Sequence, residues 1–473
     1  MRKALSDPRM IAASQSAGTY LTADERAHNG RLLRDAVPRA SQAGWKASAD
    51  RENPIDLLVR SNEGRIPTLI PIRFERMSAS PFAFFRGSAI LMAADLARTP
   101  TSGIRVQACG DAHLMNFGGF ATPERNIIFD INDLDETLPA PFEWDLKRLA
   151  ASVVIAAQYL QLPRSDEARV SRDLVREYRE RMMDYASMRA LDVWYDRIDL
   201  QKYSDRCGNP QIVEAARKRL AERIEAERRR TVPDHFYPKL VSLEGARPRI
   251  KDEPPLIYHP DASVAPGLES GYVDAIASYR ETLPEHTRIL FDRFHFLDMA
   301  IKVVGVGSVG TMCGLGLFMA ADHDPLFLQV KEARASVLEP YAGKSLHANH
   351  GQRVIAGQRI MQAASDVFLG WTRGKNGRDF YVRQLRDMKM TAVIEDWDTA
   401  MLRQYARMCA HALARAHARS GDAAMIAGYM GSGRTMDDAI SEFATEYSSQ
   451  NQHDYRTFVG AIRDGSIEVL SDG

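Results

Sequence analysis

The chain has 473 residues, of which 45% are hydrophobic, enough to bury a large core divided among roughly two or three packed subdomains. Its 62 Lys and Arg residues balance 62 Asp and Glu residues, so no overall charge would attract nucleic acid or an anionic membrane. No apolar run reaches the roughly 20 residues of a membrane span, and the N-terminus lacks the apolar stretch of a secretion signal. Four widely spaced cysteines form no CxxC pair. We expect a cytoplasmic protein of mixed α and β structure.

The first half of the chain shows both helical and strand-like patterns. Residues 1–70 are polar and have no clean hydrophobic period, which predicts an arm or peripheral helices. Apolar residues recur at helical spacing over 80–98, after a Ser-Pro pair that is typical of a helix start. Alternation over 103–111 predicts a short strand, and the apolar run 126–131 is expected to be its partner. From residue 143 to about 230 the pattern is again helical.

The second half of the chain contains a Gly-rich, strand-forming region. The stretch 213–230 carries charges of both signs, typical of a solvated helix with i,i+4 ion pairs, although a local phosphate-binding face is the alternative. Residues 233–266 are rich in Pro and polar side chains, which predicts an extended connection. The clearest patterns are a hairpin at 302–318, strands at 325–333 and 378–390, and a helix at 399–419.

The most informative stretch is 109–145, which combines acidic and amide side chains at loop positions. Asp111 follows the first predicted strand, Asn116 lies five residues later, and the second strand delivers Asp130 nineteen residues after Asp111. Phosphoryl transfer needs a carboxylate near the attacking hydroxyl and oxygen ligands for Mg²⁺ beside the phosphates. A single aspartate often only caps a turn, but the joint spacing favours a phosphoryl-transfer site.

The segment Gly110–Asn116 resembles the catalytic loop of aminoglycoside phosphotransferase-type kinases, whose pattern is H-G-D-x-H-x-x-N. Asp130 is similar to the metal-binding aspartate of that superfamily, and Asp145 to the aspartate of its later D-L-A element. The roles that the resemblance implies are catalytic base for Asp111, with His113 in the same catalytic loop, Mg²⁺ ligation for Asn116 and Asp130, and bracing of the loop for Asp145. Cys109 stands where those kinases have the first His, a departure that concerns the bracing of the loop and not its chemistry.

Longer stretches of the chain resemble a second, overlapping family. The matching segments are SPFAFFRGSA, CGDAHLMNFG, DLDETLPAPFEWDLKRLA, GVGSVGT and QVKEA. They are similar to a bacterial uncharacterised family, domain of unknown function 2252, from about residue 70 onward. That family is grouped with the protein-kinase-like folds and no substrate is settled for it, so the resemblance implies a fold more strongly than a function.

A Gly-rich motif, G-x-G-x-x-G, lies within the predicted hairpin. This pattern occurs in dinucleotide turns, in kinase phosphate loops and in tightly packed hairpins. A dinucleotide turn should lead directly into a helix, whereas more glycines and a strand follow here, which favours the kinase-type loop. The residues that would cover the phosphates are Gly305, Gly307, Ser308 and Gly310. Lys331, on the third strand, could pair with the α- and β-phosphates or could extend its ammonium group to solvent.

A kinase-type role for Lys331 has two consequences. The ammonium needs a carboxylate partner on the next helix, and Glu339 is the nearest candidate, since Glu332 points to the opposite face of the strand. The catalytic loop also precedes the Gly-rich loop by about 190 residues, the reverse of the order in kinase-like chains. The expected fold is therefore α+β and protein-kinase-like, circularly permuted and largely helical.

The sequence contains several other basic side chains with functional or structural interpretations. Arg73, Arg76 and Arg86 could contact an anionic substrate or pair with the acidic stretch 133–136. His417 stands at the end of an Ala-rich helix, where the helix dipole and a following glycine explain it without catalysis. The other histidines expected to be structural are His347, His350 and His411.

The predicted organisation has four parts. They are an N-terminal arm at 1–70, a mainly helical lobe with the catalytic and metal-binding loop at 71–300, a β-rich nucleotide-binding lobe at 301–395, and C-terminal helices at 396–473 that pack back on the helical lobe. The expected activity is that of an ATP- and Mg²⁺-dependent phosphotransferase acting on a hydroxyl of a small molecule or peptide. Two alternatives stay open: a kinase-like transferase of AMP, and a regulatory protein that binds nucleotide without turnover. Neither nucleic acid nor a membrane is expected as a partner.

Overall fold

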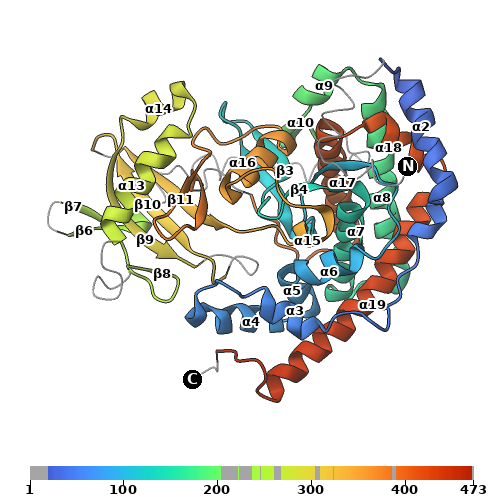
Figure 1. The fold of residues 1–473 in the computed structure, drawn as a ribbon, viewed down its shortest axis with the longest axis horizontal. Helices are drawn as coiled ribbons and strands as arrows, with labels where there is room; N and C mark the ends of the chain where they lie inside the picture. The colour runs from blue at the N-terminus through green and yellow to red at the C-terminus, as the bar shows by residue number, and fades with distance from the viewer. Residues whose placement is uncertain are drawn as a thin grey trace.

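The computed structural model describes residues 20–203, 222, 237–244, 247–259, 268–303, 309–322, 324–385 and 390–470. The chain forms two parts that lie side by side in Figure 1, a six-stranded sheet with helices and a larger, mainly helical part. Both halves of the sequence build the helical part, because the C-terminal helices return from the sheet and pack on helices that precede it. Residues 1–19 and all of the charged stretch 213–230 except residue 222 lie outside the described residues.

The helical part begins with short helices. They are α2 (Ala23–Ala36), α3 (Pro54–Arg60), α4 (Ile70–Ser78), α5 (Pro81–Gly87) and α6 (Ala89–Leu96). At the start of α5 the Ser80 hydroxyl accepts a hydrogen bond from the Ala83 amide (3.1 Å), as expected for a Ser that precedes Pro. The single helix predicted over 80–98 is interrupted at Ser88, whose φ of −117° and ψ of 38° are not helical.

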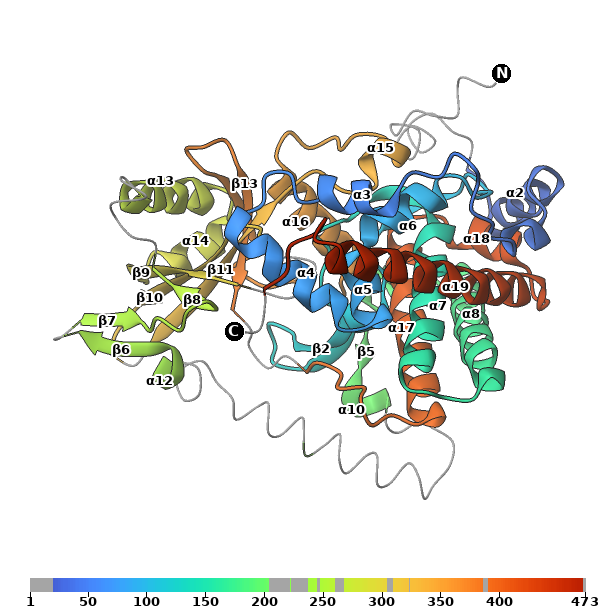
Figure 2. The same ribbon diagram turned by 90° about the horizontal axis from the view of Figure 1, so that it is seen from below.

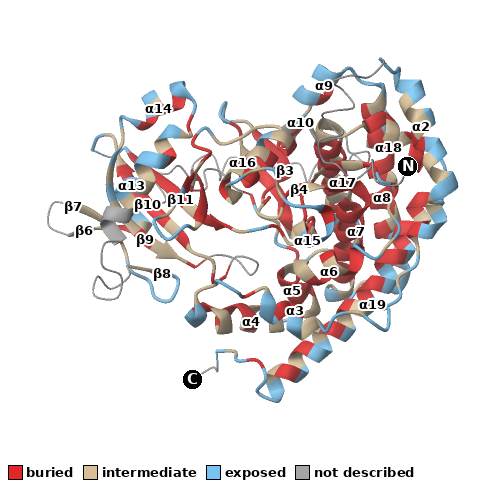
Figure 3. Ribbon diagram, viewed as in Figure 1, coloured by how far each residue is buried: buried red, intermediate tan, exposed pale blue. Residues whose placement is uncertain are grey.

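Long helices form the centre of the helical part. They are α7 (Phe142–Tyr159), α8 (Arg164–Ser187), α17 (Thr399–Ser420) and α19 (Thr435–Arg463), with the shorter α9 (Ala190–Tyr195), α10 (Leu200–Tyr203) and α18 (Ala423–Met430) beside them. Helix α7 contacts α8, α17 and α19 and is buried along almost its whole length, as Figure 3 shows. The helix predicted over 399–419 is confirmed by α17, and the helical stretch predicted from residue 143 is confirmed by α7 and α8. That stretch was expected to continue to about residue 230, but Ile198–Asp199 form a short strand, and residues 204–221 and 223–230 lie outside the described residues.

Two small antiparallel strand pairs frame the loops of the 109–145 stretch. β1 (Arg105–Ala108) pairs with β4 (Leu138–Pro141), and β2 (Phe117–Ala121) pairs with β3 (Ile127–Ile131), which also meets β5 (Ile198–Asp199). The pairing predicted between 103–111 and 126–131 is therefore wrong. β3 pairs with the strand that a short turn joins to it, and the partner of β1 contains two prolines, which concealed its strand character.

The sheet has six antiparallel strands in the order β12-β13-β11-β10-β9-β8. They are β8 (Ile257–Tyr258), β9 (His295–Lys302), β10 (Cys313–Met319), β11 (Pro325–Ala333), β12 (Gly370–Arg373) and β13 (Asp379–Gln384). The third strand predicted over 325–333 is confirmed by β11, which pairs with β10 so that Cys313 lies opposite Lys331. Of the hairpin predicted at 302–318 only the second strand, β10, is confirmed, because the first strand, β9, lies almost wholly before that range. The strand predicted over 378–390 corresponds to the shorter β13.

Helices and a second hairpin accompany the sheet. They are α12 (Tyr237–Leu240), β6 (Val241–Glu244), β7 (Arg247–Ile250), α13 (Leu268–Glu281), α14 (Glu285–Phe291), α15 (Glu339–Ala342) and α16 (His350–Met361). The connection predicted over 233–266 thus contains the β6–β7 hairpin and β8, which its composition did not indicate. Helix α16 contacts β11, β12 and β13 as well as α17 and β1, so it joins the two parts.

Each part has an apolar core of its own. The largest cluster of buried apolar side chains lies in the helical part, and separate clusters lie on the sheet. The turned view in Figure 2 shows the same division, with the sheet strands on one side and α7, α8, α17 and α19 on the other. None of the helices that the structure describes has both the length and the apolar character that crossing a membrane requires.

Candidate active site

Helix α7 fixes the loop after β1 through hydrogen bonds to its backbone. Gly110 has a φ of +81°, and a side-chain carbon there would lie 2.4 Å from the Glu136 carbonyl oxygen, so only glycine fits. The Asp145 carboxylate accepts hydrogen bonds from the Cys109 amide (2.6 Å) and the Gly110 amide (2.9 Å). These contacts are the bracing that the resemblance implied for Asp145.

A second buried layer lies behind Asp145. His417 Nε2 is 3.1 Å from Asp145 Oδ2, and its Nδ1 is 2.8 Å from the Tyr178 hydroxyl. All three side chains are buried. The helix end explained the position of His417 only in part, because its ring also holds the carboxylate that holds the loop. Helix α17 therefore also supports the loop, because His417 contacts the Asp145 carboxylate.

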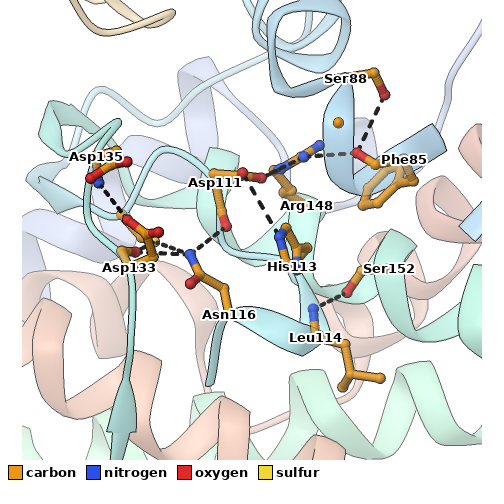
Figure 4. A network of polar contacts seen from close by, with 12 residues as sticks. Phe85, Ser88, Asp111, His113, Leu114, Asn116, Asp133, Asp135, Arg148 and Ser152 are labelled. Carbon is orange, nitrogen blue, oxygen red and sulfur yellow. Dashed lines mark hydrogen bonds and ion pairs between the residues drawn. The ribbon is translucent and has the colours of Figure 1, made fainter. Parts of the chain in front are cut away.

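The Asp111 carboxylate is fixed by an arginine from α7. Its Oδ1 accepts hydrogen bonds from Arg148 Nε (2.6 Å) and lies 2.5 Å from Arg148 Nη2, while its Oδ2 lies 3.8 Å from His113 Nε2 (Figure 4). Arg148 in turn donates to the Phe85 carbonyl (3.1 Å) and lies over the Phe85 ring. The Asp111 side chain keeps 19% of its exposure whereas Arg148 keeps 3%, so the carboxylate is open to solvent and its support is not.

His113 is an uncharged neighbour of Asp111 at neutral pH. Burial lowers the pKa of His113 to about 4, although the nearby Asp111 charge opposes that shift. The loop that carries it is fixed by the Leu114 amide, which donates to the Ser152 hydroxyl (2.9 Å). Among the described residues Nδ1 of His113 has no hydrogen-bond partner.

Asn116 connects the catalytic loop to the turn after β3. Its Nδ2 donates to the backbone carbonyls of Asp133 (2.8 Å) and Asp111 (3.1 Å), as Figure 4 shows. Because the amide nitrogen makes both contacts, the orientation of the side chain is fixed and Oδ1 is turned away from them. An oriented amide oxygen is a ligand type that a hard cation such as Mg²⁺ accepts.

Asp130 does not occupy the position that the sequence predicted for it. Its side chain is fully buried and pairs with Arg415, which is equally buried (Oδ1 to Nη2, 2.6 Å). Its other oxygen accepts a hydrogen bond from the Ala363 amide (2.8 Å). Every residue of β3 is buried, so an acidic side chain on this strand points into protein rather than toward a ligand. The contacts of Asp130 therefore give the predicted Mg²⁺ role no support.

Two other carboxylates, from the turn after β3, meet Lys331 of the sheet. The Lys331 ammonium lies 3.2 Å from Asp133 Oδ2 and 2.8 Å from Asp135 Oδ2. Tyr381 donates to the other oxygen of Asp135 (2.6 Å). Lys331 keeps only 3% of its side-chain exposure, so the alternative in which it extends to solvent does not hold.

The charges of this cluster act on one another. Burial alone would lower the pKa of Lys331, but Asp133 and Asp135 together raise it well above its ordinary value. Burial raises the pKa of Asp135, and Asp133 adds to the rise, while Lys331 and Tyr381 oppose it. The lysine is therefore a stable cation at neutral pH.

Glu339, the predicted partner of Lys331, contacts a different residue. Its Oε1 lies 3.8 Å from His350 Nδ1, and the ion pairs of Lys331 are those with Asp133 and Asp135. The expectation assumed that the carboxylate comes from the helix after the lysine strand. The structure supplies it from a turn of the helical part instead.

The Gly-rich loop is described only at its end. Gly305, Gly307 and Ser308 lie outside the described residues. Gly310 has a φ of +86° and lies against Arg65, and its carbonyl accepts a hydrogen bond from the Ile66 amide (2.7 Å). The loop joins β9 to β10, and β10 lies directly beside the strand that carries Lys331.

The residues that the sequence interpretation missed are Asp133, Asp135, Arg148 and Tyr381. A usable signal existed for the two aspartates, because they lie in the turn just beyond a strand, where side chains can face a ligand. No spacing rule indicated Arg148, which lies 37 residues from Asp111. In the part of the chain that the structure describes, no three His, Cys, Asp or Glu side chains are grouped as a metal site.

Comparison with known proteins shows the family of the chain. Residues 65–461 match the family described as "Uncharacterized protein conserved in bacteria (DUF2252)". The chain belongs to this family. The match confirms the resemblance that the sequence segments indicated from about residue 70 onward. No curated protein and no solved structure matches the chain.

Proposed function

We propose that this protein is an ATP- and Mg²⁺-dependent phosphotransferase that transfers a phosphoryl group to a hydroxyl. One observation carries the proposal: Lys331 of the sheet and Asp133 of the helical part, 198 residues apart in sequence, form an ion pair beside the Asp111 loop. Asn116 links the backbone of that loop to Asp133. A phosphate-binding lysine, a metal-binding carboxylate and a catalytic carboxylate thus share one network, as phosphoryl transfer requires.

The proposal includes a fold. The sheet would be the nucleotide lobe and the helical part the catalytic lobe of a protein-kinase-like fold in circularly permuted order. Support comes from the succession of β9, the Gly-rich loop, β10 and the lysine strand β11, followed by α16, β12 and β13. The loop with Asp111 comes earlier in the chain but meets this lobe in space through Asp133.

In this proposal Asn116 and Asp133 would hold Mg²⁺. They fit because the ion prefers oxygen ligands and commonly takes only one or two protein carboxylates, with phosphate and water oxygens completing its shell. A site of that kind needs no cluster of three acidic side chains. When bound, the ion would neutralise charge on the phosphates. Lys331 would hold the Asp133 carboxylate in position and contribute a positive charge beside the phosphates.

Asp111 would act as the general base. Arg148 holds Oδ1, so Oδ2 is the atom that would take the proton of the acceptor hydroxyl. As the proton moves, a bond forms between the acceptor oxygen and the γ-phosphorus, and the bond from that phosphorus to the bridging oxygen of ADP breaks. The proton then passes from Asp111 to solvent, and ADP and the phosphorylated acceptor leave.

Labelled nucleotide separates this proposal from its alternatives. The protein is incubated with Mg²⁺ and either γ-labelled or α-labelled ATP, with a panel of hydroxyl compounds and with water as the default acceptor. Transfer of the γ-label supports the phosphotransferase, and its loss in Asp133→Asn would tie the activity to this site. Transfer of the α-label would instead indicate a transferase of AMP. Nucleotide binding without transfer of either label would indicate a regulatory protein.

A further inference from the structure

Three arginines near the start of the family match could bind an anionic substrate. The structure gives two of them, Arg73 and Arg86, different surroundings. Arg73 is buried and donates to Asn62 Oδ1 (2.6 Å) and to the Gly87 carbonyl (2.8 Å), so it is a structural residue. Arg86 lies near the end of α5, directly after Phe85, whose carbonyl accepts a hydrogen bond from Arg148. The Asp111 charge acts on Arg86, and the Arg86 charge acts on His113, so the guanidinium lies near the proposed catalytic carboxylate.

Arg86 is half-buried, and among the described residues its guanidinium has no carboxylate partner. Within the described ranges its Nε is also buried without a hydrogen-bond partner. Its guanidinium carbon lies 5.9 Å from the centre of the Phe82 ring. Burial lowers the pKa of Arg86, while Asp111 and Glu395 act in the opposite direction. A buried hydrogen-bond donor without a partner destabilises the folded protein unless a bound ligand accepts its hydrogen bond.

The charges around Asp111 include the cations Arg86 and Arg148 and the carboxylates Asp133 and Glu136. Asp111 and Arg148 neutralise each other in their ion pair, and His113 is uncharged at neutral pH. Arg86 adds one positive charge that no ion pair cancels. The Glu395 charge acts on Arg86 from the segment before α17, but the two form no ion pair among the described residues. Arg86 is therefore a cation near the proposed base whose charge no described ion pair neutralises.

We propose that Arg86 binds an anionic group of the acceptor, so that the substrates are hydroxyl compounds that also carry a phosphate or carboxylate. This inference rests on the proposed function, because it assigns the acceptor side of the same site. Arginine suits the task, since its planar guanidinium recognises both anions through paired hydrogen bonds. Arg86 is a binding residue in this account and takes no part in proton transfer.

Matched acceptor pairs test the inference. Transfer from γ-labelled ATP is measured to glycerol 3-phosphate against glycerol, to glucose 6-phosphate against glucose, and to glyceric acid against glycerol. The wild type should prefer the charged member of a pair. In Arg86→Gln, kcat/KM for the charged member should fall by about 10- to 100-fold, the range for a lost charged hydrogen bond, and kcat/KM for the neutral member should fall much less. Arg98→Gln, which removes an exposed arginine paired with Asp50, is the control.

Two results in this assay would overturn the inference. One is an equal rate with charged and neutral members in the wild type. The other is an equal loss in Arg86→Gln for both members and for hydrolysis of ATP, which would place Arg86 on the transferred phosphoryl group instead. Arg86→Lys, which keeps the charge, should retain part of the preference, and thermal denaturation of each variant checks that the fold is intact.

A binding measurement separates failure of this inference from failure of the proposed function. Ligand-observed NMR with glycerol 3-phosphate and with glucose 6-phosphate should show binding to the wild type, to Asp111→Asn and to Arg98→Gln, but not to Arg86→Gln. That pattern would support the anion site even if the protein neither bound nor turned over ATP, an outcome that would refute the proposed function alone. No binding of any charged compound by the wild type would overturn the anion site.

Discussion

Asp130 and Asp133 lie three residues apart and belong to two regions of opposite character. Asp130 belongs to the buried support, defined here as Asp130, Asp145, Arg415 and His417, in which every side chain is buried. Asp133 belongs to the junction site, defined as Asp111, Asn116, Asp133 and Lys331. The Asp133 side chain is 37% exposed. Both aspartates pair with a cation, but only the junction site has carboxylates open to solvent. Access therefore distinguishes residues that hold the loop from residues that can meet a substrate.

The largest change in stability is expected from the buried support. Asp130→Ala leaves the Arg415 charge buried without its carboxylate, which typically costs about 3–5 kcal/mol. Urea denaturation of the variant and the wild type measures the free energy of unfolding. A loss below about 1 kcal/mol would mean that this ion pair does not stabilise the fold. The description of Asp130 and Arg415 as a buried support would then be wrong.

Asp133→Asn is the matched change in the junction site. It should lower Mg²⁺-dependent turnover by about a hundredfold or more, because a metal contributes several kcal/mol to transition-state stabilisation. The free energy of unfolding should change much less than in Asp130→Ala, since Asp133 is partly exposed. Turnover is measured against Mg²⁺ concentration. If Asp133→Asn required no more Mg²⁺ than the wild type and kept its rate, Asp133 would not be a metal ligand.

The pH dependence of stability tests the burial of His113. Its pKa of about 4 lies below its ordinary value of 6.5, so the folded state binds this proton less readily than the unfolded state. The contribution of the uncharged His113 to the free energy of unfolding is present in full above about pH 6.5. It is lost as pH falls toward 4, by at most about 1.4 kcal/mol per pH unit. Urea denaturation at several pH values should show a smaller loss in His113→Gln than in the wild type. His411, with a pKa also lowered to about 4, contributes equally in both proteins.

Lys331→Met should have the smallest of these effects. Removing its positive charge should weaken ATP binding by about 10-fold, as for the loss of one charged hydrogen bond. Lys375→Met is the control on the same sheet, because its ion pair with Asp274 is exposed and contributes little. Equilibrium binding of ATP to both variants measures the difference. Equal affinities would place Lys331 in the support and outside the nucleotide site.

Strong local patterns predicted much of the fold. The β10–β11 pair, α7 and α17 follow from runs of apolar and β-branched residues whose period is clear. Strand pairing was less accessible, because the partner of β1 reads Leu-Pro-Ala-Pro, a composition that is unusual for a strand. The β6–β7 hairpin was not predicted for a similar reason, because its strands lie in a polar, Pro-rich segment.

The candidate site was predicted in part. Asn116 contacts the backbone of Asp111 and Asp133, and Lys331 contacts the Asp133 side chain, so the three predicted residues are linked through one that was not predicted. Asp130 was predicted from its spacing to Asp111 and its similarity to the metal-binding aspartate of the kinases, and spacing does not tell whether a strand is buried on both faces. The partner of Lys331 came from a turn almost two hundred residues earlier, and only the three-dimensional arrangement shows that contact.

The Asp111→Asn variant tests the central claim most directly, because it separates an enzyme from a nucleotide-binding protein. The substitution keeps the shape of the side chain and removes most of its basicity. Turnover of γ-labelled ATP should fall by roughly 10²–10⁴, the range for loss of a general base, while ATP affinity, measured by equilibrium binding, should stay within a few-fold because Lys331 and Asp133 are unchanged. Turnover equal to that of the wild type, or loss of ATP binding in the folded variant, would contradict the account.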